Sequence, residues 1–62
     1  MYEIKEPITF KNQRESAKRI GITPESLCRI INGKTATTKM TAEAILREYS
    51  KRAKLNEYFT LL

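Results

Sequence analysis

The chain contains no histidine, no tryptophan and only one cysteine among its 62 residues. One cysteine without histidine cannot supply the ligands of a zinc finger or the Cys–His pair of a nucleophilic enzyme. No other cluster of catalytic residue types is present, so we expect no enzymatic activity, no metal, no cofactor and no small-molecule substrate. Cys28 has no partner for an internal disulfide, which predicts a reducing, cytoplasmic setting.

Long apolar runs are also absent. No stretch approaches the ~20 apolar residues that a membrane-spanning helix requires. The segment Met1–Glu6 lacks the basic start and the apolar core of a signal peptide. We therefore expect no membrane association.

Acidic residues are scarce relative to basic ones. The chain has 12 Lys and Arg against 7 Asp and Glu, which gives a formal net charge of +5. Such a balance favours an anionic partner such as nucleic acid. The length predicts a single domain over residues 1–62 with a small core.

A first helix is predicted over residues 13–20. Asn12 is an N-cap residue, and Glu15 is placed to act as its reciprocal partner. Gly21 ends the helix because the turn that follows needs a positive φ, which a side chain penalises. Ala17 is small, as a close crossing with the next helix requires.

A second helix is predicted over residues 24–31. Thr23 is its N-cap, and Pro24 stands at the first helical position, where a missing N–H costs nothing. The spacing i, i+3, i+4 of its apolar residues predicts a buried stripe of Leu27, Ile30 and Ile31. Asn32–Gly33 predicts a left-handed end.

A third helix is predicted to begin after Thr37 or Thr38, either of which can cap it. A helical period joins its apolar residues Ala42, Ile45, Leu46, Tyr49 and Ala53. On its surface, Glu48 and Arg52 have the spacing of an ion pair, as do Glu43 and Arg47.

The two ends of the chain are less regular. Pro7 blocks a regular helix in residues 1–11, which are predicted to be irregular or extended. Residues 55–62 are predicted to add a last helical turn or two. The sequence therefore predicts an all-α, compact helix-turn-helix domain of three to four short helices.

Residues 13–35 resemble the helix-turn-helix of the phage repressor and Cro family. The matching elements are Gln13, Ala17, the Gly21–Ile22 turn, Leu27, Ile30 and the run Asn32–Thr35. Residues 8–23 are also similar to small regulators encoded by phages and integrated elements of Gram-positive bacteria. The resemblance is weaker over residues 41–45 and 56–59. One departure is that only 12 residues precede Gln13, so a short or extended segment replaces the family's usual first helix.

The resemblance implies a sequence-specific DNA-binding transcriptional regulator, Cro-like or repressor-like. Its recognition helix, about 24–31, would dock in the major groove of double-stranded DNA. Two-fold operators in the family imply a homodimer on DNA. Most of the apolar residues near the C-terminus are expected to close the core left open by the short N-terminal segment, and any surplus would form such an interface. These residues are Tyr49, Leu55, Tyr58, Phe59, Leu61 and Leu62.

The recognition helix presents six residues away from its apolar stripe, namely Thr23, Pro24, Glu25, Ser26, Cys28 and Arg29. Arg29 either bonds guanine O6 and N7 or pairs with Glu25. Glu25 either accepts a hydrogen bond from a cytosine amine or repels DNA and so acts as a filter against wrong sequences. Pro24 can only touch a thymine methyl or pack. Cys28 is interpreted as a small, partly exposed filler rather than a redox switch.

Phosphate contacts are expected on both sides of the recognition helix. Gln13 corresponds to the family's phosphate-binding position, although it is also simply a good first helical residue. The acid-free stretch after the recognition helix matches the place where the family grips the DNA backbone, through Asn32, Lys34, Thr35, Thr37 and Lys39. The alternative for that stretch is an ordinary solvated loop.

A second interpretation stays open. Small phage proteins of this kind can act as modulators or antirepressors by binding a larger repressor protein. In that case Pro24, Glu25 and the apolar tail would contact the protein partner.

Overall fold

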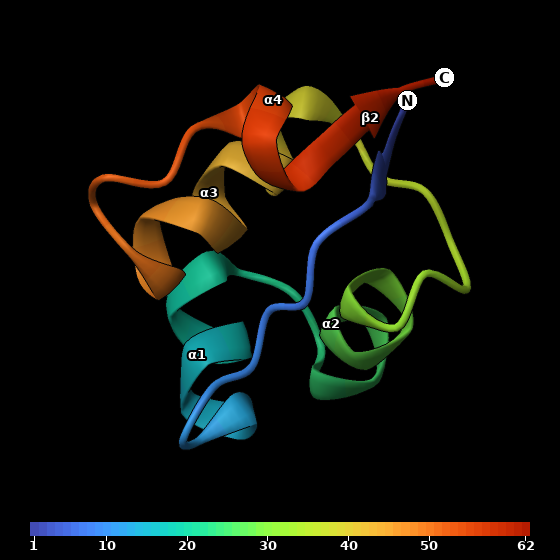
Figure 1. Ribbon diagram of the computed structural model, residues 1–62. Coiled ribbons are helices and arrows are strands. Elements are labelled where there is room, and N and C mark those ends of the chain that lie inside the picture. Colours follow the sequence, from blue (N-terminus) through green and yellow to red (C-terminus); the bar gives the residue numbers. More distant parts are fainter.

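The computed structural model describes all residues, 1–62. Four helices and two short strands follow one another along the chain (Figure 1): β1 Tyr2–Ile4, α1 Gln13–Ile20, α2 Pro24–Ile31, α3 Lys39–Tyr49, α4 Leu55–Tyr58 and β2 Phe59–Leu61. The chain termini lie side by side, because β1 and β2 pair with each other. None of the helices combines the length and the apolar character needed to cross a membrane.

The predicted bounds of α1 and α2 are confirmed, and so are their caps. Asn12 Oδ1 accepts the N–H of Glu15 at 3.1 Å, and Thr23 Oγ1 accepts the N–H of Ser26 at 3.1 Å. The Glu15 side chain does not return a bond to Asn12; its carboxylate lies 3.7 Å from the Arg19 guanidinium instead. Gly21 adopts φ 98°, and both its N–H and that of Ile22 reach the Ala17 carbonyl.

The end of α2 has the hydrogen bonds of a Schellman motif. Gly33 has φ 76°, its N–H reaches the Ile30 carbonyl at 3.1 Å, and the Lys34 N–H reaches the Arg29 carbonyl at 2.9 Å. These bonds satisfy carbonyls that the helix leaves open. They also fix the direction in which the chain leaves α2 toward α3.

Helix α3 begins after Thr38, whose Oγ1 accepts the N–H of Thr41 at 3.3 Å. It ends at Tyr49, so Arg52 lies beyond the helix and the predicted Glu48–Arg52 pair is wrong. Glu48 contacts Arg19 on α1 at 2.9 Å instead. Glu43 and Arg47 form no ion pair, so this prediction is wrong as well; the attraction between exposed partners is weak in water.

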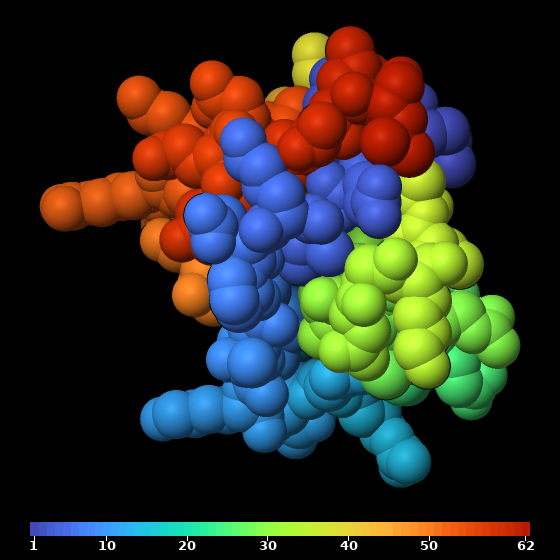
Figure 2. Space-filling model, turned by 45° about the vertical axis from the view of Figure 1, so that its right-hand side comes forward, coloured from blue at the N-terminus to red at the C-terminus, as the bar shows by residue number.

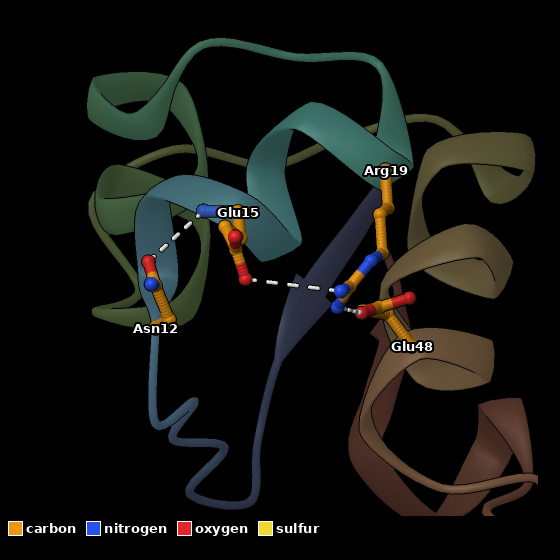
Figure 3. A network of polar contacts seen from close by, with 4 residues as sticks. All are labelled: Asn12, Glu15, Arg19 and Glu48. Carbon is orange, nitrogen blue, oxygen red and sulfur yellow. Dashed lines mark hydrogen bonds and ion pairs between the residues drawn. The ribbon is translucent and has the colours of Figure 1, made fainter.

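The Arg19 contact joins α1 to α3. Figure 3 shows its guanidinium between the carboxylates of Glu15 and Glu48, with Asn12 at the start of the same helix. The hydrogen bond that Arg19 donates to Glu48 raises the pKa of Arg19 above its ordinary value, and the charges of Glu48 and Glu15 raise it further. The charge of Arg19 is therefore compensated within the domain.

The prediction of an all-α fold is wrong. Strands β1 and β2 form an antiparallel sheet in the register Tyr2↔Leu61, Glu3↔Thr60 and Ile4↔Phe59. The expected helical tail stops after the single turn of α4, because the extended N-terminal segment has backbone groups that need partners. Residues Phe59–Leu61 satisfy them and place the Phe59 side chain inside.

The core takes residues from every part of the chain. Its fully enclosed members are Ile8, Ala17, Leu27, Ile30, Ala42, Ile45, Leu46 and Phe59. Ile8 and Phe59 come from the two ends, so the terminal segments close the side that a first helix would otherwise cover. Phe10, Tyr49 and Tyr58 extend this closure through edge-to-face ring contacts, with centroids 6.1 and 5.6 Å apart.

We expect Gly21→Val to destabilise the domain by about 1–3 kcal/mol, because a β-branched residue resists the positive φ of this turn. A Cβ at this position would meet nothing within 4 Å, so the loss would come from backbone strain and not from a clash. Thermal unfolding checks this, with ~4–8 °C per kcal/mol for a domain of this size. Gly21→Asn is the matched control and should lose less, since Asn tolerates the left-handed region. Equal melting temperatures for Gly21→Val and the unaltered chain would contradict the prediction.

Candidate nucleic-acid interface

The N-termini of α1 and α2 lie next to each other. Gln13 is half-buried, and its Nε2 donates to the carbonyl of Pro24 at 3.4 Å. At the start of α1, the Asn12 cap satisfies the N–H of Glu15, while those of Gln13 and Arg14 have no intrahelical acceptor. Two free N–H groups at the positive end of a helix can bind a phosphate oxygen.

Helix α2 has a buried and an exposed side. Leu27 and Ile30 face the core, as predicted. The residues left exposed on or beside the helix are Thr23, Pro24, Glu25, Cys28, Arg29 and Asn32. Ser26 is half-buried, and its hydroxyl accepts from Thr23 Oγ1 at 2.9 Å. Thr23 and Ser26 are thus bonded to each other across the first turn of the helix.

Arg29 is exposed and has no carboxylate within ion-pair distance. The alternative in which Glu25 holds Arg29 in a salt bridge is therefore absent from the structure. Glu25 is likewise exposed and unpaired. Both side chains are therefore free to form hydrogen bonds or ion pairs with a binding partner.

Asn32 makes a contact that sequence reasoning missed. Its Nδ2 lies 3.1 Å from the Sγ of Cys28, one helical turn earlier. The i, i+4 spacing of an amide and a thiol was the signal that could have indicated it. This contact holds the amide of Asn32 against α2 and gives the exposed Cys28 a local partner.

Most of the residues predicted to contact phosphate in the segment after α2 are exposed. Lys34, Thr35 and Lys39 are exposed, and Lys39 opens α3. Thr37 is different: its residue is 7% exposed, and its N–H and C=O bond to Tyr2 at 2.8 and 2.6 Å. The backbone of Thr37 is therefore bonded within the fold, and its buried side chain is not available as a phosphate contact.

Positive charge is uncompensated along this surface. Arg29, Lys34 and Lys39 form no ion pair, in contrast to Arg19. Residues of α2 and the following loop gather on one side of the molecule, away from the segment after α3 (Figure 2). Arg14, which sequence reasoning passed over, is exposed in the first turn of α1 beside Gln13. The chain therefore offers exposed cations in and after α2, free N–H groups at the start of α1, and the exposed side of α2.

Comparison of the chain with protein-family models, curated proteins and solved structures finds no match. No group of three or more His, Cys, Asp or Glu side chains is placed to hold a metal ion.

We expect Asn12→Ala to lower the free energy of unfolding by about 1 kcal/mol, because the N–H of Glu15 loses its acceptor. Asn12→Asp should keep the cap and most of the stability. Denaturant titrations of the three proteins give the comparison. If the alanine and aspartate variants are equally stable, the cap does not hold the start of α1.

Proposed function

We propose that this protein is a sequence-specific, double-stranded-DNA-binding transcriptional regulator that acts in the cytoplasm. We further propose kinship with the phage repressor and Cro family. The observation that carries the proposal is the exposed side of α2 with its unpaired Arg29, together with the exposed, unpaired Lys34 and Lys39 in the segment that leads from α2 to α3. Uncompensated cations on one face release counterions when they meet phosphates, which is the main source of DNA affinity.

In this proposal α2 is the recognition helix. A helix fits the major groove, and the exposed side of α2 offers Arg29 for a bidentate contact with guanine. Pro24 has no polar group and can meet a thymine methyl. Glu25 can accept from the N4 amine of cytosine, or it disfavours sequences that bring a phosphate or carbonyl toward it.

Phosphates on either side of the groove would be held by the flanking segments. The free N–H groups of Gln13 and Arg14 would meet one strand at the start of α1. Lys34, Thr35, Lys39 and Asn32 would meet the other strand after α2. Such contacts position the helix without reading sequence.

The protein would regulate transcription by occupying an operator. A protein of this size that sits on an operator blocks the polymerase without any catalytic step. The basic surface is compatible with that role, because electrostatic steering speeds the search for the site.

A second candidate is a modulator that binds a larger repressor protein. The observation that favours it is the exposed, unpaired Glu25 in the first turn of α2, where a carboxylate would repel phosphates. Salt dependence separates the two candidates, because only duplex binding loses affinity steeply as salt rises.

The experiment is fluorescence-anisotropy binding to the DNA upstream of its own reading frame and to a scrambled duplex, over a range of salt. Tighter binding to the upstream DNA and a steep salt dependence are expected. Flat or absent binding to both duplexes would reject the proposal and favour the repressor-binding candidate.

We expect Arg29→Ala to weaken binding to the specific duplex by ~1–3 kcal/mol and to relax the base preference at one position. The loss follows from removing both guanine contacts. Competition with single-base operator variants measures it. Arg47→Ala, exposed on α3, is the matched control and should bind as the unaltered chain does. Equal effects of the two substitutions would show that Arg29 acts by charge alone.

Lys34→Ala should weaken binding to all duplexes alike and reduce the slope of log K against log salt by about 1. The reason is the loss of one phosphate contact. Lys51→Ala, which removes the same charge from an exposed position outside this surface, is the control. An unchanged slope for Lys34→Ala would remove the segment after α2 from the interface.

A further inference from the structure

A hollow of about 130 Å³ lies where α3 ends and the chain turns toward α4. Its apolar lining consists of Leu46, Ala53 and Leu55. Leu46 is buried in the core, and Ala53 and Leu55 are half-buried and pack against the core. Since a water molecule takes about 30 Å³ in the liquid, the hollow has room for one aliphatic side chain. It is too small for a small-molecule ligand, whose sites measure about 300–1,000 Å³.

The turn that forms the hollow is held by its own hydrogen bonds. The N–H of Ser50 bonds to the carbonyl of Leu46 at 2.7 Å, and the N–H of Ala53 bonds to the carbonyl of Ser50 at 3.3 Å. The N–H of Arg52 bonds to the Ser50 hydroxyl at 3.3 Å. The backbone around the hollow is therefore ordered before a partner binds, which lowers the entropy cost of binding.

Four exposed cations surround the hollow. Two of them line it, and two stand beside it in the chain; they are Arg47 and Lys51, and Arg52 and Lys54. None of the four side chains donates a hydrogen bond or pairs with a carboxylate. Glu48, the one acid among residues 47–55, is held by the guanidinium that joins α1 to α3. The positive charge around the hollow is thus uncompensated.

The end of α3 does not account for this charge. A helix C-terminus attracts cations, but the attraction falls off within the last turn. Arg52 and Lys54 lie beyond the end of the helix at Tyr49. Side chains that served the last carbonyls would be hydrogen-bonded to them, and none is. The cations are therefore available to an external anion.

We propose that this hollow binds an acidic segment of another protein, with one aliphatic side chain of that segment in the hollow. The aliphatic side chain would be removed from water by Leu46, Ala53 and Leu55. The carboxylates on either side of it would meet the surrounding cations, which give the contact its charge complementarity. Glu43 is the one acid in the lining, so the partner's carboxylates are expected on the side of Arg47 and Lys51.

Other polyanions fit this site less well. Proteins that bind single-stranded nucleic acid stack bases on aromatic side chains, and the hollow has no aromatic lining. A membrane surface is bound by apolar side chains that protrude into the lipid. The apolar side chains here are buried or half-buried. An acidic protein segment uses both the cations and the aliphatic floor.

The hollow and α2 lie on different sides of the molecule. In Figure 1 the segment after α3 (orange) is separated from α2 (green) by α1 and α3. Figure 2 shows side chains of the orange segment projecting away from the green ones. A segment bound at the hollow would therefore leave the exposed side of α2 accessible.

The experiment titrates the whole ¹⁵N-labelled chain, without DNA, with a blocked peptide of one leucine flanked on both sides by glutamates. Its failure is thus distinct from a failure to bind DNA. We expect saturable shifts of the amides of residues 43–55, with a Kd below about 1 mM. The same peptide with serine in place of leucine should bind about tenfold more weakly, because the hollow then stays unfilled.

Ala53→Leu is the sharpest variant, because the longer side chain would fill the hollow without changing any charge. We expect it to abolish the preference for the leucine peptide. Lys51→Gln leaves the hollow open and should weaken both peptides about two- to fivefold. Lys18→Gln removes the same charge from an exposed position on α1 and is the matched control, with unchanged binding. The comparison of these two variants decides the matter if Ala53→Leu does not fold.

Four outcomes would overturn the proposal. Residues 43–55 could show no saturable shifts. The leucine and serine peptides could bind equally, which would mean that charge alone attracts the anion. Single-stranded oligothymidine or phosphatidylserine vesicles, titrated in the same way, could bind more tightly than the leucine peptide. Lys18→Gln could also weaken binding as much as Lys51→Gln.

Discussion

The close approach of α1 and α2 at Ala17 is the constraint on which the other contacts depend. Ala17 is fully buried, and its carbonyl accepts from both Gly21 and Ile22, which turns the chain within two residues. A larger side chain at Ala17 or a negative φ at Gly21 would separate the helices. The contact between Gln13 and the carbonyl of Pro24 exists only because this turn brings the two N-termini together. The proposed DNA-binding surface is therefore a consequence of one tight turn.

The pairing of the chain ends is the second contact that determines the fold, because it covers one side of the core. Without a helix before α1, one side of a small core would be open to water. Ile8 and Phe59 fill that side, and the β1–β2 ladder satisfies the backbone of the segments that carry them. On its other edge, β1 bonds to Thr37 through the backbone of Tyr2. One residue that was expected to contact DNA therefore has a structural role. The pairing of β1 with β2 also leaves Leu61 exposed on the unpaired side of β2.

Much of the candidate site could be predicted because its geometry is local. The caps at Asn12 and Thr23 and the left-handed Gly21 depend on residues within one turn, and the structure confirms them. The exposed side of α2 follows from the helical period of Leu27 and Ile30. Ion pairs were predicted less well. Glu48 pairs with Arg19, which is 29 residues away in the sequence. It does not pair with Arg52, because α3 ends at Tyr49 and Arg52 lies beyond the helix.

The sequence by itself determined α1 and α2 with their starts and ends, the presence of α3, and the inward stripe of α2, since these follow from backbone preferences and periodicity over a few residues. Only the tertiary structure decided that residues 59–61 form a strand and not a further helical turn. A strand is stable only beside another strand, and its partner, β1, stands at the opposite end of the chain. The fold class therefore depended on a long-range pairing that no local pattern contains. The state of Thr37 and the open edge at Leu61 depended on that pairing as well.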